Sequence, residues 1–296
     1  MHLPYHLIDV FTQTGFQGAQ IAVFPHTADL SAELMQKLAA ELTISETVFI
    51  MPATDGVSDF RIKIYTPTQE LDFAGHPLLA VGYALRHVYA VTAATLRLQL
   101  NAEIISIAIT LVDQFTKIQF SVSTVYRTDE YLPSTKELGE ILHLDEKNID
   151  QAELHPRLVS CRGDYLLVPV RSLQAFNAAR FNVNKWTTSF VATLASRIGL
   201  VWKSSERDAA SYRLRLLGKD IADASDPPVG SAAPAMAVYL FSELQAGEYH
   251  AMIQRGGDGK RKSLIEINLI KTATSVSAIN VGGYAVQIGS GSITLD

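Results

Sequence analysis

Cysteine is almost absent from the 296-residue chain, which contains a single one, Cys161. One cysteine excludes an internal disulfide, a cysteine-based zinc site and any mechanism that needs two thiols. Cys161 comes just before the apolar run 165–170, a pattern that predicts a turn between two strands. This setting favours a structural thiol over a nucleophile, because a reactive thiolate needs electropositive surroundings.

Long apolar runs and long basic runs are also lacking. No stretch approaches the roughly 18 apolar residues of a membrane-spanning helix, and the first residues show no signal-peptide pattern. We therefore expect a cytoplasmic protein that does not bind a membrane. Lys and Arg total 25 against 30 Asp and Glu, and the densest basic patch, 260–262, is too short to follow a nucleic-acid backbone. A small-molecule ligand is the better expectation than nucleic acid.

Short strand-like runs dominate the rest of the sequence. Many alternate apolar and polar residues, as in the segment 60–65 (FRIKIY), which is typical of half-buried antiparallel strands. Helices are predicted over 32–42, where Ser31 can cap the first turn, over 77–87 and over 232–244. The last two are apolar on all sides, which indicates that other elements surround them.

These two apolar helices occur in matching surroundings. The sequence RIKIY is followed by GHPLLAVGYAL from Gly75, and RLRLL is followed by GSAAPAMAVYL from Gly230. The spacing, about half the chain, favours a duplication, with chance similarity of two apolar helices as the alternative. We therefore expect an α+β fold of two pseudo-equivalent lobes, each a curved, largely antiparallel sheet around a central helix. The predicted lobes are 1–123 and 124–296, and the last strands, about 280–296, can return to the N-terminal lobe.

Glu46 is the first candidate for chemistry. It lies between the predicted helix 32–42 and the apolar run 48–51. Such a carboxylate is either part of a solvated connector or partly desolvated, with a raised pKa, and able to act as an acid or base. Both interpretations are open at this stage.

The second candidate is the segment Ala74-Gly75-His76-Pro77, which opens the first apolar helix. Proline suits the first helical turn, and glycine lets a ligand approach the backbone closely. The free N–H groups of a helix start attract carboxylates or phosphates, and the same field favours a neutral His76. His76 is then a hydrogen-bond partner or base, with a cap or a packed side chain as the alternatives.

The third candidate opens the second apolar helix. Gly230 and Ser231 provide another start suited to anions, and Asp226 on the approaching loop is either a second acid or base or a turn residue. Two such helix starts could hold a small anionic substrate between paired acid/base groups. That arrangement predicts proton transfer that needs no cofactor and no metal ion.

At these motifs the chain resembles the phenazine-biosynthesis PhzF family, which shares its fold with diaminopimelate epimerase and proline racemase. The resemblance covers most of the chain and is carried by the ordered segments IDVF (8–11), FQG (16–18), SET (45–47), YTP (65–67), FAGHP (73–77) and GSA (230–232). It implies two pseudo-equivalent lobes and a Glu46 that moves a proton within the substrate. It further implies that His76, Asp226 and Ser231 complete the site and that backbone at Gly75 and Gly230 holds the substrate.

The residues around this set differ from those of many relatives. The chain has Ala19-Gln20 where an Asn-Pro pair is common, Val229 where Thr is usual, and Cys161-Arg162-Gly163 in place of a Thr-Gly turn. The acid/base set is thus retained while its surroundings change. Proton transfer is therefore a firmer expectation than the dihydro-hydroxyanthranilate substrate of phenazine synthesis.

The leading hypothesis is an isomerase that shifts a proton, and with it a double bond, in a small carboxylate. Glu46 would carry the proton while Asp226 and His76 position and polarise the substrate. An epimerase using Glu46 and Asp226 from opposite faces is the alternative enzyme, and a catalytically silent small-molecule-binding protein is the alternative of another class. The resemblance also implies a homodimer.

Overall fold

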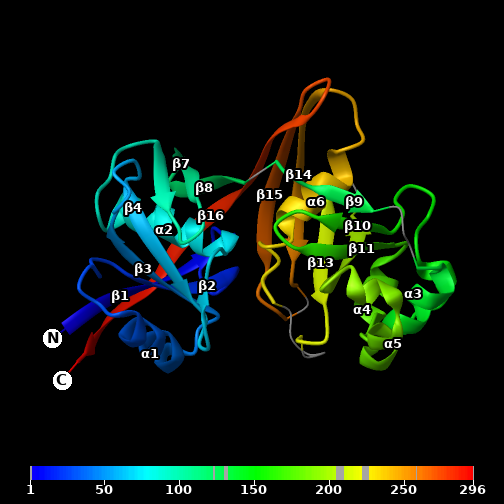
Figure 1. The fold of residues 1–296 in the computed structure, drawn as a ribbon, viewed down its shortest axis with the longest axis horizontal. Helices are drawn as coiled ribbons and strands as arrows, with labels where there is room; N and C mark the ends of the chain where they lie inside the picture. Colours follow the sequence, from blue (N-terminus) through cyan, green and yellow to red (C-terminus); the bar gives the residue numbers. More distant parts are fainter. Residues whose placement is uncertain are drawn as a thin grey trace. The chain divides into compact units, whose positions relative to one another are not determined.

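The computed structural model describes residues 2–122, 124–129, 133–204, 210–221, 227–257 and 259–295. The chain forms two compact units. The first unit comprises Met1–Val122, Arg261–Leu264 and Asn280–Asp296, and the second comprises Ser123–Lys260 and Ile265–Ile279. The long strand β16 (Val276–Thr294) therefore begins in the second unit and continues through the first (Figure 1).

The first unit is a sheet that closes on itself. Its strand order is β1-β2-β3-β4-β6-β7-β8-β16, and β1 also pairs with β16 along its whole length. The short β5 pairs with β4. The strands are β1 (His2–Val10), β2 (Ala19–Phe24), β3 (Glu46–Pro52), β4 (Phe60–Tyr65), β5 (Glu70–Leu71), β6 (Thr95–Gln99), β7 (Ile104–Val112) and β8 (Phe115–Val122).

Two helices accompany this sheet. Helix α1 (Ala32–Leu42) begins at Ser31, whose hydroxyl accepts a hydrogen bond from the Leu34 N–H at 3.2 Å. Helix α2 (Gly75–His87) packs against β1, β2, β3, β7 and β8. Most of α2 is buried, because a helix that is apolar on all sides requires contact all round.

The second unit has the strand order β15-β14-β13-β12-β11-β10-β9. These strands are β9 (Arg127–Asp129), β10 (Arg157–Ser160), β11 (Asp164–Val170), β12 (Arg197–Lys203), β13 (Tyr212–Leu217), β14 (Gly247–Arg255) and β15 (Ser263–Lys271). The helices are α3 (Thr135–Leu142), α4 (Leu173–Ala178), α5 (Val183–Thr188), α6 (Ala233–Phe241) and two 3-10 turns, Glu146–Asn148 and Phe190–Thr193.

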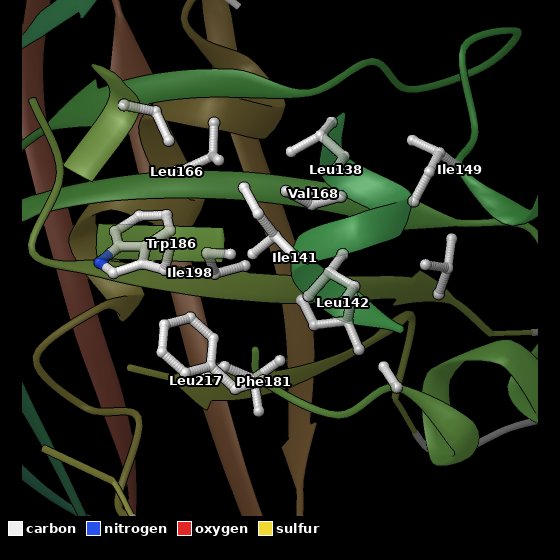
Figure 2. Close-up of a cluster of buried hydrophobic side chains, with 14 of the residues drawn as sticks. Leu138, Ile141, Leu142, Ile149, Leu166, Val168, Phe181, Trp186, Ile198 and Leu217 are labelled. Atoms are coloured by element: carbon white, nitrogen blue, oxygen red, sulfur yellow. The ribbon is translucent and has the colours of Figure 1, made fainter. Parts of the chain in front are cut away.

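A compact apolar core forms between the sheet of the second unit and its small helices. In Figure 2 the side chains of Leu138, Ile141 and Leu142 from α3 lie against β11 and β12. Trp186 of α5 completes this cluster, and its ring centroid lies 5.6 Å from that of Phe181. This core fixes β11 and β12, which lead to the residues considered below.

The same pairing pattern occurs in both units. β2 and β3 pair in parallel, β3 and β4 antiparallel, and β4 and β6 in parallel. In the second unit β11 and β12, β12 and β13, and β13 and β14 repeat this order. β3 and β12 also share one residue-by-residue burial pattern, as do β4 and β13. Under this alignment the counterpart of Glu46 is Arg197, since each opens its strand.

The mixed α+β class expected from the sequence is confirmed, and most described strand pairs are antiparallel. The helix over 32–42 is confirmed at both ends. The helix predicted over 232–244 is wrong at its end, because the chain turns after Phe241, with Leu244 N–H bonded to the Phe241 carbonyl. No helix of the described segments is long and apolar enough to cross a membrane.

Candidate active site

Glu46 is the first residue of β3 and lies beside Ile21 of β2 in the parallel pair. Its side chain is 13% exposed. The interpretation of Glu46 as part of a solvated connector is therefore wrong. The strand begins two residues before the apolar run 48–51, so the Glu46 carboxylate belongs to the sheet and is largely buried.

His76 is the partner of Glu46. Its Nε2 atom lies 2.6 Å from Oε2 of Glu46, and its side chain is 6% exposed. His76 is the second residue of α2, so the helix start brings the imidazole to the start of β3. A carboxylate only accepts hydrogen bonds, so the proton of this contact belongs to Nε2 of His76. The opposite ring atom, Nδ1, is buried and has no hydrogen-bond partner among the described residues.

Two opposing effects act on the pKa of Glu46. Burial raises the pKa of this carboxyl, but the charge and hydrogen bond of His76, with a smaller contribution from Ser45, more than offset that effect. The net pKa lies below the ordinary value of 4.5. The raised pKa considered from the sequence is therefore wrong for the structure as it stands, since that interpretation counted burial and omitted His76. The Glu46 carboxyl is thus ionised at neutral pH.

Gly75 opens α2, and the packing of Phe120 explains its lack of a side chain. A Cβ at Gly75 would come within 2.6 Å of the Phe120 ring, which is fully buried. No side chain caps this helix start, and the preceding residue is Ala74. The N–H groups of the first turn are therefore free of side-chain acceptors, which is the condition for binding an anion.

The second helix start has a similar character. Helix α6 follows Gly230 and Ser231, again without a side-chain cap. Ser231 accepts a hydrogen bond from the hydroxyl of Tyr165 at 3.2 Å. Sequence reasoning missed Tyr165, because it lies 66 residues before Ser231 and belongs to no motif. The predicted acid/base residue Asp226 lies outside the described residues.

The single thiol stands apart from this chemistry. Cys161 is buried, and burial raises the pKa of its thiol to about 11, an effect that Arg162 only partly opposes. Such a thiol is a poor nucleophile. Within the described segments, no group of three or more His, Cys, Asp or Glu side chains could hold a metal ion.

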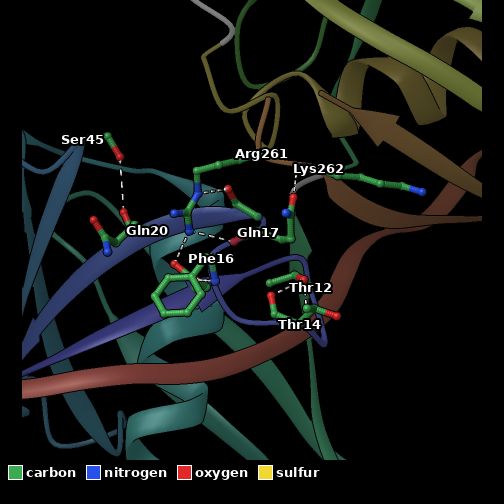
Figure 3. A network of polar contacts seen from close by, with 10 residues as sticks. Thr12, Thr14, Phe16, Gln17, Gln20, Ser45, Arg261 and Lys262 are labelled. Carbon is green, nitrogen blue, oxygen red and sulfur yellow. Dashed lines mark hydrogen bonds and ion pairs between the residues drawn. The ribbon is translucent and has the colours of Figure 1, made fainter. Parts of the chain in front are cut away.

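A third network fixes the loop between β1 and β2 (Figure 3). Arg261 donates hydrogen bonds to the carbonyls of Gln17 and Gly18 and forms an ion pair with the fully buried Asp9. Asp9 also accepts a bond from the Phe16 N–H at 2.7 Å. The basic patch 260–262 thus contributes a structural clamp to the first unit.

The family model for phenazine biosynthesis-like proteins, PhzC-PhzF, matches residues 8–291. The chain belongs to this family. It is 26% identical to an uncharacterized isomerase of Mesorhizobium japonicum, with 98% of each chain covered. It is 27% identical to the trans-2,3-dihydro-3-hydroxyanthranilate isomerase of Pseudomonas chlororaphis, over 98% of this chain and 99% of that one.

The fold agrees with this assignment. A PhzF-family protein of Bacillus anthracis superimposes with a TM-score of 0.85 at 20% identity, covering 100% of both chains. The predicted family and its mixed α+β fold are therefore confirmed. By homology the protein is an isomerase of the PhzF family.

Proposed function

We propose that this PhzF-family isomerase moves a proton between two carbons of a small carboxylate and thereby shifts a double bond. The observation that carries the proposal is the buried pair of Glu46 and His76, with 2.6 Å between Oε2 and Nε2. The Glu46 carboxylate removes a proton from a carbon next to an electron-withdrawing group. The electron pair delocalises towards a second carbon, which receives a proton from the Glu46 carboxyl after that carboxyl has exchanged with solvent, so that one proton leaves the substrate and one returns.

His76 supports both steps of this transfer. Its Nε2–H stabilises the Glu46 carboxylate before and after the transfer, and its Nδ1, which has no partner among the described residues, can form a hydrogen bond with a polar group of the substrate. Asp226 is proposed to position and polarise the substrate. The backbone at Gly75 and Gly230, with the Ser231 hydroxyl, is proposed to bind its carboxylate.

The internal repeat does not supply a second copy of Glu46 for a symmetrical two-base epimerisation. The counterpart of Glu46 in the second unit is Arg197, whose guanidinium lies 2.5 Å from Asp220. The second unit therefore does not duplicate the Glu46 carboxylate at the equivalent strand start. A two-base epimerisation would therefore depend on Asp226 as its second base, whereas the proposed proton shift needs only Glu46 as its base.

The substrate class follows from the relatives and from the uncapped helix starts. We propose a small amino- or hydroxy-substituted unsaturated carboxylate. The substrate named for the Pseudomonas chlororaphis relative, trans-2,3-dihydro-3-hydroxyanthranilate, is the first compound to test. A homodimer in the cytoplasm remains part of this proposal, and light scattering of the purified protein would measure the dimer.

The test is deuterium uptake from heavy water into a panel of such carboxylates, followed by mass spectrometry. Uptake by the wild-type protein that disappears in Glu46→Gln supports the proposal. The matched control is Glu41→Gln, since Glu41 is an exposed glutamate on α1. Full exchange in Glu46→Gln would refute the role of Glu46, and inversion at a single carbon would identify an epimerase.

A further inference from the structure

Tyr165 is the second residue of β11 and is almost completely buried, with 4% of its surface exposed. Its hydroxyl donates a hydrogen bond to Oγ of Ser231, just before α6, at 3.2 Å. A buried tyrosine hydroxyl needs a polar partner, and here that partner is a side chain proposed to contact substrate. The contact joins the β10–β11 hairpin to the start of α6.

The turn before β11 is shaped to accept the Tyr165 ring. Gly163 has φ +150°, and a Cβ there would lie 2.9 Å from Cε2 and 3.2 Å from the hydroxyl oxygen of Tyr165. The turn is closed by the Cys161 N–H, which donates to the Gly163 carbonyl at 3.0 Å. The lack of a side chain at Gly163 thus provides the space in which the tyrosine ring lies.

This contact determines what Ser231 can do. Since Tyr165 donates, Oγ of Ser231 accepts, and the Ser231 hydroxyl hydrogen remains available to a further acceptor. Among the described residues, no hydrogen bond uses that hydrogen. Helix α6 also begins without a side-chain cap, two residues after Ser231. A carboxylate placed there would receive the Ser231 hydroxyl together with backbone N–H groups.

We propose that Tyr165 is a positioning residue for substrate binding, which fixes the Ser231 hydroxyl so that it donates to the substrate carboxylate. This inference rests on the proposed substrate-binding role of Ser231. Tyr165 itself acts through Ser231 and does not contact the substrate.

The surroundings of Tyr165 keep its hydroxyl protonated, so that it remains a hydrogen-bond donor. Burial raises the pKa of the Tyr165 phenol, and the nearby Asp164 and Cys161 add to this, while Ser231 and Arg197 oppose it. The phenol therefore stays protonated across the neutral range. The hydrogen bond to Ser231 is available at every pH at which the enzyme would work.

The test measures binding of 3-hydroxyanthranilate, the aromatic analogue of the relative's substrate, by calorimetry. 2-Aminophenol, which is the same ring without the carboxylate, is the matched control ligand. Tyr165→Phe should raise Kd for 3-hydroxyanthranilate about 3- to 10-fold, the usual effect of one hydrogen bond. Its effect on 2-aminophenol should be less than about twofold.

The decisive measurement is whether the effects of the Tyr165 and Ser231 substitutions on Kd depend on each other. Ser231→Ala should weaken 3-hydroxyanthranilate binding at least as much as Tyr165→Phe, and the double variant should be no weaker than Ser231→Ala alone. Tyr239→Phe is the control for loss of a buried tyrosine hydroxyl, because Tyr239 donates to the His155 carbonyl at 2.9 Å instead. That variant should bind 3-hydroxyanthranilate as the wild type does.

The proposal would be overturned if the losses of binding free energy in Tyr165→Phe and Ser231→Ala add up in the double variant. An unchanged Kd in Tyr165→Phe would also overturn it. So would absence of 3-hydroxyanthranilate binding to the wild-type protein, since Ser231 would then lose its assigned role. The deuterium experiment is separate from this one. If the effects of Tyr165→Phe and Ser231→Ala on Kd are not additive but no deuterium enters any substrate, the role of Tyr165 is supported and the proton shift is refuted. If deuterium enters a substrate but the two effects are additive, the proton shift is supported and the role of Tyr165 is refuted.

Discussion

Oε2 of Glu46 and Nε2 of His76 lie 2.6 Å apart, and both side chains are almost buried. The contact joins the first residue of a strand to the second residue of a helix, 30 positions later. It keeps a desolvated carboxylate ionised, which burial alone would disfavour. In the proposed reaction, this ionised carboxylate would remove the proton from the substrate.

Replacing His76 should therefore raise the pKa of Glu46. In His76→Leu only the smaller effect of Ser45 opposes burial, so the carboxyl pKa should move from below 4.5 to above it. His76→Gln, which keeps a hydrogen-bond donor without a positive charge, should give an intermediate value. Carbon-detected NMR titration of the Glu46 carboxyl would measure all three proteins. An unchanged pKa in His76→Leu would contradict this account of the pair.

Gly75→Ala should destabilise the protein through Phe120. The new Cβ would lie 2.6 Å from the Phe120 ring in a fully packed core, and such overpacking costs about 1–3 kcal/mol. The Gly75→Ala/Phe120→Leu double variant should recover part of this loss relative to Phe120→Leu alone. Urea unfolding would measure each free energy.

Gly289→Ala is the control for the Gly75 substitution. A Cβ at Gly289 meets only Leu7 at 3.8 Å, an ordinary contact distance. Its free energy of unfolding should stay within about 0.5 kcal/mol of the wild type, the range usual for substitutions that disturb no packing. Equal losses in the two alanine variants would show that the Phe120 contact is not the cause.

The parts of the structure that could be predicted are those that depend on residues close together in the sequence. The Ser31 cap and the helix to Leu42 follow from neighbouring residues, as does the burial of α2. Helix α3 was missed although Ser134 and Glu137 have the spacing of a capping box, because the surrounding segment is polar. The last strands, expected over about 280–296, are one strand, Val276–Thr294, whose length comes from its partners rather than from its own residues.

The long-range contacts at the candidate site could not be predicted in the same way. Arg261 and Asp9 are 252 residues apart, and Tyr165 and Ser231 are 66 apart. In a single sequence, nothing marks such residues as neighbours. The glutamate, the histidine and the glycines were identified by their place at element ends, whereas the residues that orient them depend on tertiary packing.

Arg261→Met should destabilise the first unit by about 2–4 kcal/mol at pH 7, since it leaves the buried Asp9 carboxylate without its ion pair. Because Arg261 is partly exposed, this loss of stability is smaller than the loss from breaking a fully buried ion pair. Burial already raises the pKa of Asp9 above 3.8, and loss of Arg261 would raise it further. A raised acidic pKa favours the folded state at low pH, so the loss should shrink as pH falls towards 3.8.

Two further variants test that explanation by chemical unfolding at several pH values. Asp9→Asn combined with Arg261→Met should recover part of the loss and remove the added pH dependence, because the buried charge is gone. Lys262→Met removes an adjacent positive charge, but Lys262 bonds to Gln17 and Gly18 only through its backbone. If Lys262→Met lowers the free energy of unfolding by a similar amount, the cause is the change in net charge rather than the loss of the Asp9 contact.

Cys161 should react slowly with thiol reagents in the folded protein. Its thiol is buried and has a pKa of about 11, so about one molecule in a thousand carries the thiolate at pH 8. Unfolding in guanidinium exposes the side chain and returns the pKa towards 9.0, so labelling by a disulfide reagent should then be complete within seconds to minutes. Cys161→Ala should keep deuterium uptake within about twofold of the wild type, since the proposed proton transfer does not use a thiol. Rapid stoichiometric labelling of the native protein, or loss of uptake in Cys161→Ala, would instead give the thiol a chemical role.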